Sequence, residues 1–208
     1  YHYMKLRDLF GNIPIVTEVG TPVSLPTVPR AEAFKFIEQE LLENVDNLPL
    51  LDAKYNGHVT RAAGYAILAE LYLNAEIWSG TPRWDDCIKA CDYILAGNAG
   101  SQTGTLAIDT DLTTPFCNTN STSSNENLFV MAYDYQNSTN RCGWNGDFDQ
   151  FAQRYIYGGT SNGNNGAVVI PTAFDKFDEK DLRKSEWMLF GPQWYYDVEQ
   201  QGDGITDV

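Results

Sequence analysis

Two helices joined by a turn are predicted by residues 61–95, RAAGYAILAELYLNAEIWSGTPRWDDCIKACDYIL. The first part is apolar on nearly every side, which is typical of a helix packed on several faces. We expect this helix to start after Thr60 as its N-cap and to end near Ile77. A turn follows at residues 79–82, and a second helix is expected from about residue 83 to 96, closing at Gly97.

The spacing of large and small residues in these two helices resembles a tetratricopeptide repeat (TPR). The first helix of such a repeat needs a large residue, a Leu-small pair and then an aromatic residue. Here these positions are filled by Tyr65, Leu68-Ala69 and Tyr72. In the second helix Cys87, Cys91 and Ile94 fit the repeat, although the turn is about six residues longer than in a standard repeat. The hairpin therefore predicts a helical scaffold with a binding function, and not the core of an enzyme.

The rest of the chain is expected to be less regular towards its C-terminal end. Helices are predicted for residues 1–10, stopped at Gly11, and for residues 30–47, where apolar residues recur at three- and four-residue steps. A short extended segment at residues 13–18 precedes a proline-containing linker at 20–29.

Residues 97–127 and 134–169 are rich in polar residues and glycine, and we expect them to be mostly irregular. Residues 128–133 are a candidate for a short buried strand, and residues 174–184 for a short acidic amphipathic segment. The predicted fold class is mainly α, with TPR-like helical hairpins, long irregular loops and a few short strands.

Four segments, in chain order, carry a resemblance to a known family. They are LRDLFGNIPIV at 6–16, VTRAAGYAILA at 59–69, SNENLF at 124–129 and FDEKDLR at 177–183. The first resembles the "lfGdvPlv" signature of the SusD/RagB family, outer-membrane glycan-binding lipoproteins of Bacteroidetes. The others resemble that family's "t-r-x-A-A-x-A-l-L-A" helix, its "s-x-E-x-I-f" turn and its "f-x-x-x-D-x-R" element.

The resemblance implies a fold and a setting. TPR-like hairpins would form an alpha-alpha superhelix as the frame, and an irregular face would carry the ligand site. The chain would be one central, partial SusD-like domain, with scaffold at residues 1–97 and a loop-rich ligand face at 98–208. It also implies a SusC-like TonB-dependent transporter as partner, a surface position at the cell outer membrane, and membrane attachment only through a lipid anchor outside this chain.

Composition and motifs exclude several function classes. A formal net charge of −14 repels phosphate backbones, so we expect no nucleic-acid partner. His2 and His58 have no ligand-like spacing, and no phosphate-binding, dinucleotide or nucleophile-elbow motif is present, so we expect neither a metal, a cofactor nor catalysis. Cys117 and Cys142 could pair or remain free. The acidic tail at 203–207 could bind calcium, although it lacks the EF-hand pattern.

Aromatic rings beside polar side chains and glycines suggest where a sugar would bind. Rings stack on the C–H faces of a sugar, while amides and charged groups bond its hydroxyls. The predicted ligand-binding residues are Trp144, Asn145, Tyr155 and Tyr157, with Trp78 and Trp194 as outlying candidates. Other aromatic residues in such loops pin the loop to the scaffold.

Glu126, Asp181 and Arg183 are expected to have structural roles. Glu126 can accept bonds from backbone N–H groups at a turn, and Asp181 with Arg183 can form charge-assisted bonds that fix loops. Two other functions stay open. One is a protein-interaction scaffold with an apolar groove between residues 30 and 95; the other is a glycoside hydrolase, which needs two carboxylates about 5–10 Å apart in a cleft.

Overall fold

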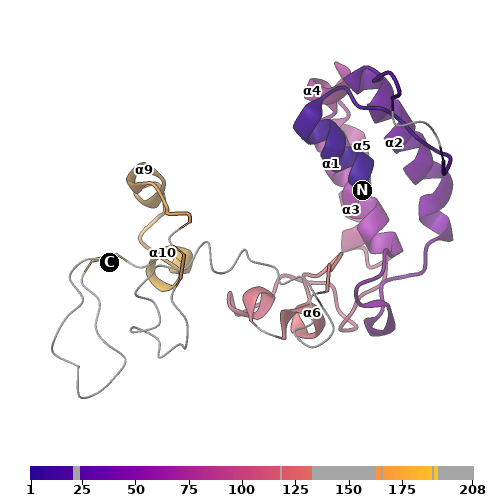
Figure 1. Cartoon of the computed structure of the whole chain (residues 1–208). Helices are drawn as coiled ribbons and strands as arrows, with labels where there is room; N and C mark the ends of the chain where they lie inside the picture. Colours follow the sequence, from indigo (N-terminus) through magenta and orange to yellow (C-terminus); the bar gives the residue numbers. More distant parts are fainter. Residues whose placement is uncertain (21–23, 118, 133–162, 165, 189, 192–208) are drawn as a thin grey trace. The chain divides into compact units, whose positions relative to one another are not determined.

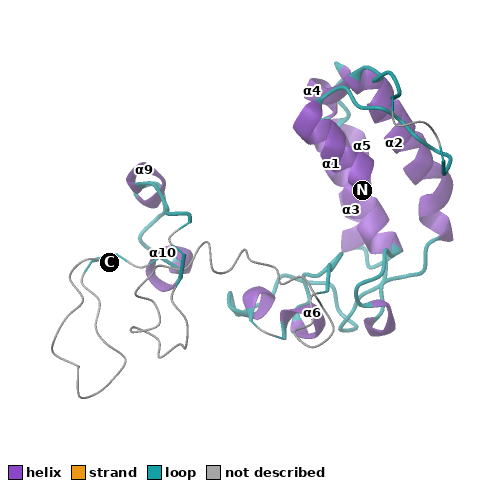
Figure 2. Ribbon diagram, viewed as in Figure 1, coloured by secondary structure: helices purple, strands orange, loops and turns teal. Residues whose placement is uncertain are grey.

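The chain is mainly helical, as its sequence predicts. The computed structural model describes residues 1–20, 24–117, 119–132, 163–164, 166–188 and 190–191. They belong to two compact units, residues 1–132 and 133–208 (Figure 1). Within the described ranges, helices are joined by loops and turns, and no strand is drawn (Figure 2).

The first unit is built on a group of packed helices. They are α1 (His2–Phe10), α2 (Arg30–Asn44), α3 (Arg61–Leu73), α4 (Ala75–Ser79) and α5 (Trp84–Leu95). Helices α3 and α5 form the predicted hairpin, while α2 packs against α1, α3 and α4. The core between them contains Met4, Phe34, Ile37, Leu68 and Leu71. Gly64 lets the end of the α2 segment come close, because a Cβ there would lie 2.6 Å from Val45 Cγ2.

The first helix of the hairpin is shorter than predicted. It ends at Leu73, and the short helix α4 follows, where the sequence suggests one helix to about Ile77. The interruption is at Asn74, whose side-chain amide donates a 2.9 Å hydrogen bond to Glu70 O and so competes with the helical ladder. The long turn noted in the sequence therefore contains a helical turn of its own.

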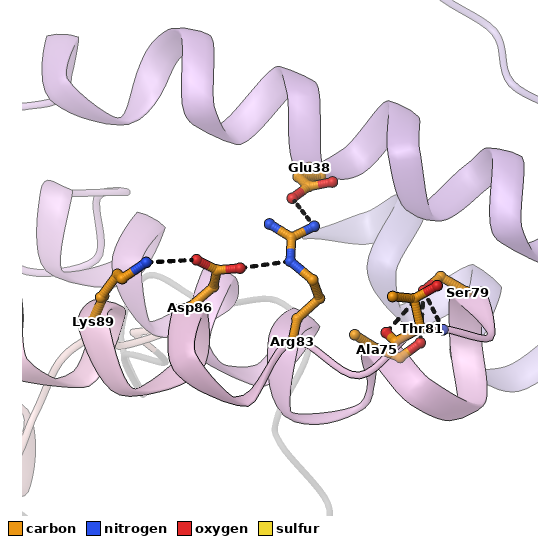
Figure 3. A network of polar contacts seen from close by, with 7 residues as sticks. All are labelled: Glu38, Ala75, Ser79, Thr81, Arg83, Asp86 and Lys89. Atoms are coloured by element: carbon orange, nitrogen blue, oxygen red, sulfur yellow. Dashed lines mark hydrogen bonds and ion pairs between the residues drawn. The ribbon is translucent and has the colours of Figure 1, made fainter.

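Polar contacts fix the connection between α4 and α5. Ser79 Oγ donates to Ala75 O at 2.8 Å, and Arg83 bridges Glu38 of α2, at 2.9 Å, and Asp86 of α5 (Figure 3). The hairpin itself closes on the stacked rings of Tyr65 and Tyr93, whose centroids are 3.9 Å apart. These contacts hold α2, α3 and α5 in one block.

Thr60 occupies the predicted N-cap position of α3 but does not form the expected capping bond. Its backbone is extended, as at an N-cap, and its buried hydroxyl has no hydrogen-bond partner. The first helical amide is satisfied differently, because Arg61 N donates to Pro49 O at 2.8 Å. The sequence therefore predicts where α3 starts, but not that Pro49 O accepts the hydrogen bond of its first amide.

The predicted strand at 128–133 is wrong over its described part, residues 128–132, which form a loop. A strand needs a neighbouring strand with which to form a ladder. Among the described residues, β-type pairing is limited to two isolated bridges, Ile13 with Val28 and Leu51 with Gly100. Side-chain bonds, described below, hold residues 124–127 in place instead.

Residues 98–132 belong to the same compact unit as the helices. The attachment is close at Gly100, where a Cβ would lie 2.4 Å from Leu51 O. In addition, Leu51 N donates to Ala99 O at 2.8 Å. Gly100 has φ +86°, a conformation that L-residues rarely adopt.

Gly100→Ala is therefore expected to lower the free energy of unfolding by about 2–4 kcal/mol. Gly104→Ala is a matched control, since Gly104 has φ +89° and nothing within 4 Å of its added Cβ. The control should cost only about 1–2 kcal/mol, the penalty of the backbone conformation alone. Urea denaturation of both variants measures the difference, and equal losses would contradict a close approach at Gly100.

In the second unit the described residues include α9 (Pro171–Phe174) and α10 (Leu182–Glu186), within and beside the predicted amphipathic segment. Asp181 caps α10 by accepting a bond from Arg183 N at 3.0 Å. The Arg183 guanidinium also donates to Asp181 Oδ2 at 2.6 Å. The charge-assisted bond predicted for this pair is therefore present.

Candidate binding site

A small pocket lies in the first unit, beside the end of the α3–α5 hairpin. Its cavity volume is about 10 Å³. It is lined by two chain segments and one further side chain: Leu51, Tyr55, Asn56, Gly57, His58, Gln102, Asn127, Leu128, Phe129 and Val130. Gly57 and His58 are exposed, so the pocket can be reached from solvent.

The first wall is a tight turn that follows Leu51. Asp52 accepts a 3.0 Å bond from Lys54 N and starts the 3-10 helix η2 (Ala53–Tyr55). The chain then reverses, with His58 N donating to Tyr55 O at 2.9 Å. Gly57, with φ +79°, packs its Cα side against Ala132 of the opposite wall, because a Cβ there would lie 3.5 Å from Ala132 Cβ.

The second wall is held from behind by the buried carboxylate of Asp109. Its oxygens accept bonds from Ser124 Oγ at 2.6 Å, and from the backbone and side-chain nitrogens of Asn125 at 3.1 and 2.7 Å. Glu126 returns the contact by accepting a 2.8 Å bond from Asp109 N, which confirms its predicted role at a turn. These bonds position residues 127–130, which line the pocket.

The same bonds make this wall sensitive to acid. The hydrogen bond from Ser124, with those from Asn125, lowers the pKa of Asp109 below its ordinary value. A carboxyl group whose folded-state pKa is lowered stabilises the fold above its unfolded pKa, and this stabilisation is lost as pH falls through the folded pKa. Thermal midpoints from pH 7 downward should therefore fall less steeply for Asp109→Asn than for the natural sequence. Ser124→Ala should lie between them, and three parallel curves would contradict the network.

The side chains of the pocket combine aromatic surfaces with carboxamides. Tyr55, His58 and Phe129 supply rings, with those of Tyr55 and His58 edge-on at 6.3 Å. Gln102 and Asn127 are oriented by bonds to backbone carbonyls, Gln102 to Ser121 and Asn127 to Asn120. The Asn56 side-chain oxygen is buried without a hydrogen-bond partner. Apolar faces beside amide groups match a small polyhydroxylated ring.

Most of the predicted ligand-binding residues cannot be compared with this pocket. Trp144, Asn145, Tyr155, Tyr157 and Trp194 lie outside the described residues, as do Cys142 and the acidic tail. They remain predictions.

Trp78 is placed differently from its predicted role. Its side chain is only 7% exposed, in the core beside α2, and the Arg7 guanidinium carbon lies 3.4 Å from its ring centroid. A ring covered in this way cannot stack on a glycan, so Trp78 is a core residue. It is covered because α4, which carries it, packs against α2.

The residues that line the pocket were not singled out from the sequence. The Asn56-Gly57 turn and the SNENLF segment were both visible there, but nothing in the sequence brings them together. Their contact depends on the Asp109 network and on the approach at Gly100, which are long-range features.

In the described part of the chain, no group of three or more His, Cys, Asp or Glu side chains could hold a metal ion. No described helix is long and apolar enough to cross a membrane. Cys87, Cys91 and Cys117 carry free thiols.

Comparison with known proteins gave no family assignment. No protein-family model matches the chain, and no curated protein matches it significantly.

Proposed function

We propose that this chain is part of a SusD-like binding protein, which captures an oligosaccharide at the cell surface and passes it to a SusC-like TonB-dependent transporter. The α3–α5 hairpin is then one TPR-like unit of the frame. The protein is held at the outer membrane by a lipid anchor outside this chain. The order of the four resembling segments supports this proposal, since together they reach from residue 6 to residue 183.

The observation that carries the binding function is the composition of the pocket. Three rings and three carboxamides line it. The cavity itself has a volume of only about 10 Å³, room for about one water molecule, so a sugar unit would rest across its mouth and not inside it. A sugar hydroxyl can donate to the unpartnered Asn56 oxygen once the turn adjusts around it.

Binding without hydrolysis fits the same pocket better than glycosidase activity does. Glycosidases act through two carboxyl groups that flank the scissile bond. Among the residues that the structure describes, no Asp or Glu lines the pocket, although the chain has 28 of them.

Three of the four segments that resemble the SusD/RagB family have structural roles in this fold. Residues 59–69 supply the start of α3, and Ser124 to Glu126 form the turn that Asp109 fixes. Asp181 and Arg183 bond to each other at the start of α10. Proteins of one family that bind different ligands would share residues with such structural roles.

Calorimetry of the folded chain against a panel of neutral and acidic oligosaccharides tests the proposal. We expect binding to at least one neutral oligosaccharide, because the net charge of −14 disfavours acidic ones. Affinity electrophoresis in polysaccharide gels provides a second readout. A chain shown by circular dichroism to be folded and helical, yet binding nothing in either assay, would contradict the proposal.

A further inference from the structure

The outer side of α5 carries a row of exposed apolar side chains. Trp84, Ile88, Cys91 and Leu95 follow one another at steps of four, three and four residues and so lie on one face of the helix. Trp84 is 47% exposed, Ile88 56% and Leu95 76%, while Cys91 is partly buried. We call these four residues the α5 stripe.

The α5 stripe continues onto α3. Tyr93 stacks on Tyr65, and at 100° per residue it lies roughly opposite the stripe on the helix. The stripe therefore lies on the other side of the hairpin. On that side α3 presents Leu73, which is 56% exposed.

Two aspartates border the stripe on its other edge. Asp85 and Asp92 are seven residues apart, so they lie in line along α5. Both are exposed, and neither forms an ion pair within the part of the chain that the structure describes. The neighbouring Lys89 is directed to Asp86, at 3.2 Å.

The negative charge beside the α5 stripe favours a basic partner on this surface. A second copy of this chain would bring another net charge of −14 against the same acidic edge. A helix with a basic edge would instead place opposite charges along Asp85 and Asp92.

We propose that the α5 stripe with Leu73 is a docking surface for an amphipathic helix of a separate protein. That helix has apolar residues at three- and four-residue steps and a row of Lys or Arg beside them. This surface is distinct from the candidate glycan pocket and does not depend on its function.

Fluorescence anisotropy with a labelled peptide tests the proposal. The probe is an amphipathic helical peptide of about 20 residues with leucine at these steps and lysine along one edge. Its matched partner has glutamate in place of each lysine. Both are titrated with the full chain and with three variants whose fold is checked by circular dichroism: Ile88→Glu, Ile108→Glu and the double variant Asp85→Lys/Asp92→Lys. Ile108 is also exposed and lies outside the hairpin, so it controls for the added charge.

The natural chain should bind the lysine peptide more tightly than the glutamate peptide. Ile88→Glu should weaken binding by at least about tenfold, Ile108→Glu should leave it unchanged, and the double variant should reverse the peptide preference. Absence of binding, equal effects of the two Ile→Glu variants, or an unchanged preference would overturn the proposal. So would a concentration-dependent dimer, seen by sedimentation, that Ile88→Glu abolishes, because the occupant would then be a second copy.

Discussion

Replacing Trp78 with alanine is expected to lower the free energy of unfolding by about 3–5 kcal/mol. The ring is almost fully buried among the residues that join α2, α3 and α4. It also lies closer to the Arg7 guanidinium than the ring of Phe34 does, and the three nitrogens of this group are buried with no hydrogen-bond partner among the described residues. Burial already lowers the pKa of Arg7 to about 10, and without the ring this cation would lose its main favourable contact.

Trp84→Ala is the matched control for this substitution. Trp84 is about half exposed at the start of α5, so its loss should cost less than about 1 kcal/mol. Urea denaturation monitored by circular dichroism measures both variants. If Trp78→Ala left stability unchanged and removed glycan binding, Trp78 would be a ligand residue after all.

The variants Tyr55→Ala and Phe129→Ala are each expected to weaken oligosaccharide binding by at least about tenfold. These two rings come from opposite walls of the pocket and are its largest apolar surfaces. Neither is in the main helical core, so the fold should persist. Calorimetry with the tightest-binding oligosaccharide measures the loss.

Phe10→Ala controls for the loss of an aromatic side chain. Phe10 is largely exposed at the end of α1 and does not line the pocket. Its removal should leave affinity unchanged. Equal affinities for the three variants and the natural chain would place the sugar elsewhere, and Trp144, Tyr155 and Tyr157 would be the next residues to replace.

Helix periodicity made much of the frame predictable. The starts and ends of α1 and α5 lie within about two residues of their predicted limits, as is usual for helix boundaries. The α2 segment also ends where predicted, although its last residues, Val45–Asn47, form the 3-10 helix η1. The break at Asn74 was missed because the apolar pattern of the segment continues through it.

The candidate pocket was not predictable, because it depends on contacts between distant segments. Gln102 and Asn127 come together because they donate to the backbone carbonyls of neighbouring residues, Ser121 and Asn120. Glu126 could be recognised as a turn residue from its neighbours, but its partner, 17 residues earlier, could not. The burial of Trp78 was not predictable either, because a tryptophan beside a turn has the same local sequence pattern whether it faces solvent or the core.

Hydrogen exchange of the full chain, with and without a bound oligosaccharide, tests the central claim most directly. A ligand that rests in the pocket should slow exchange of the amides in residues 51–58 and 127–130 and leave the amides of α5 unchanged. Protection confined to residues outside both pocket walls, with a saturating oligosaccharide, would contradict the claim that this pocket is the binding site.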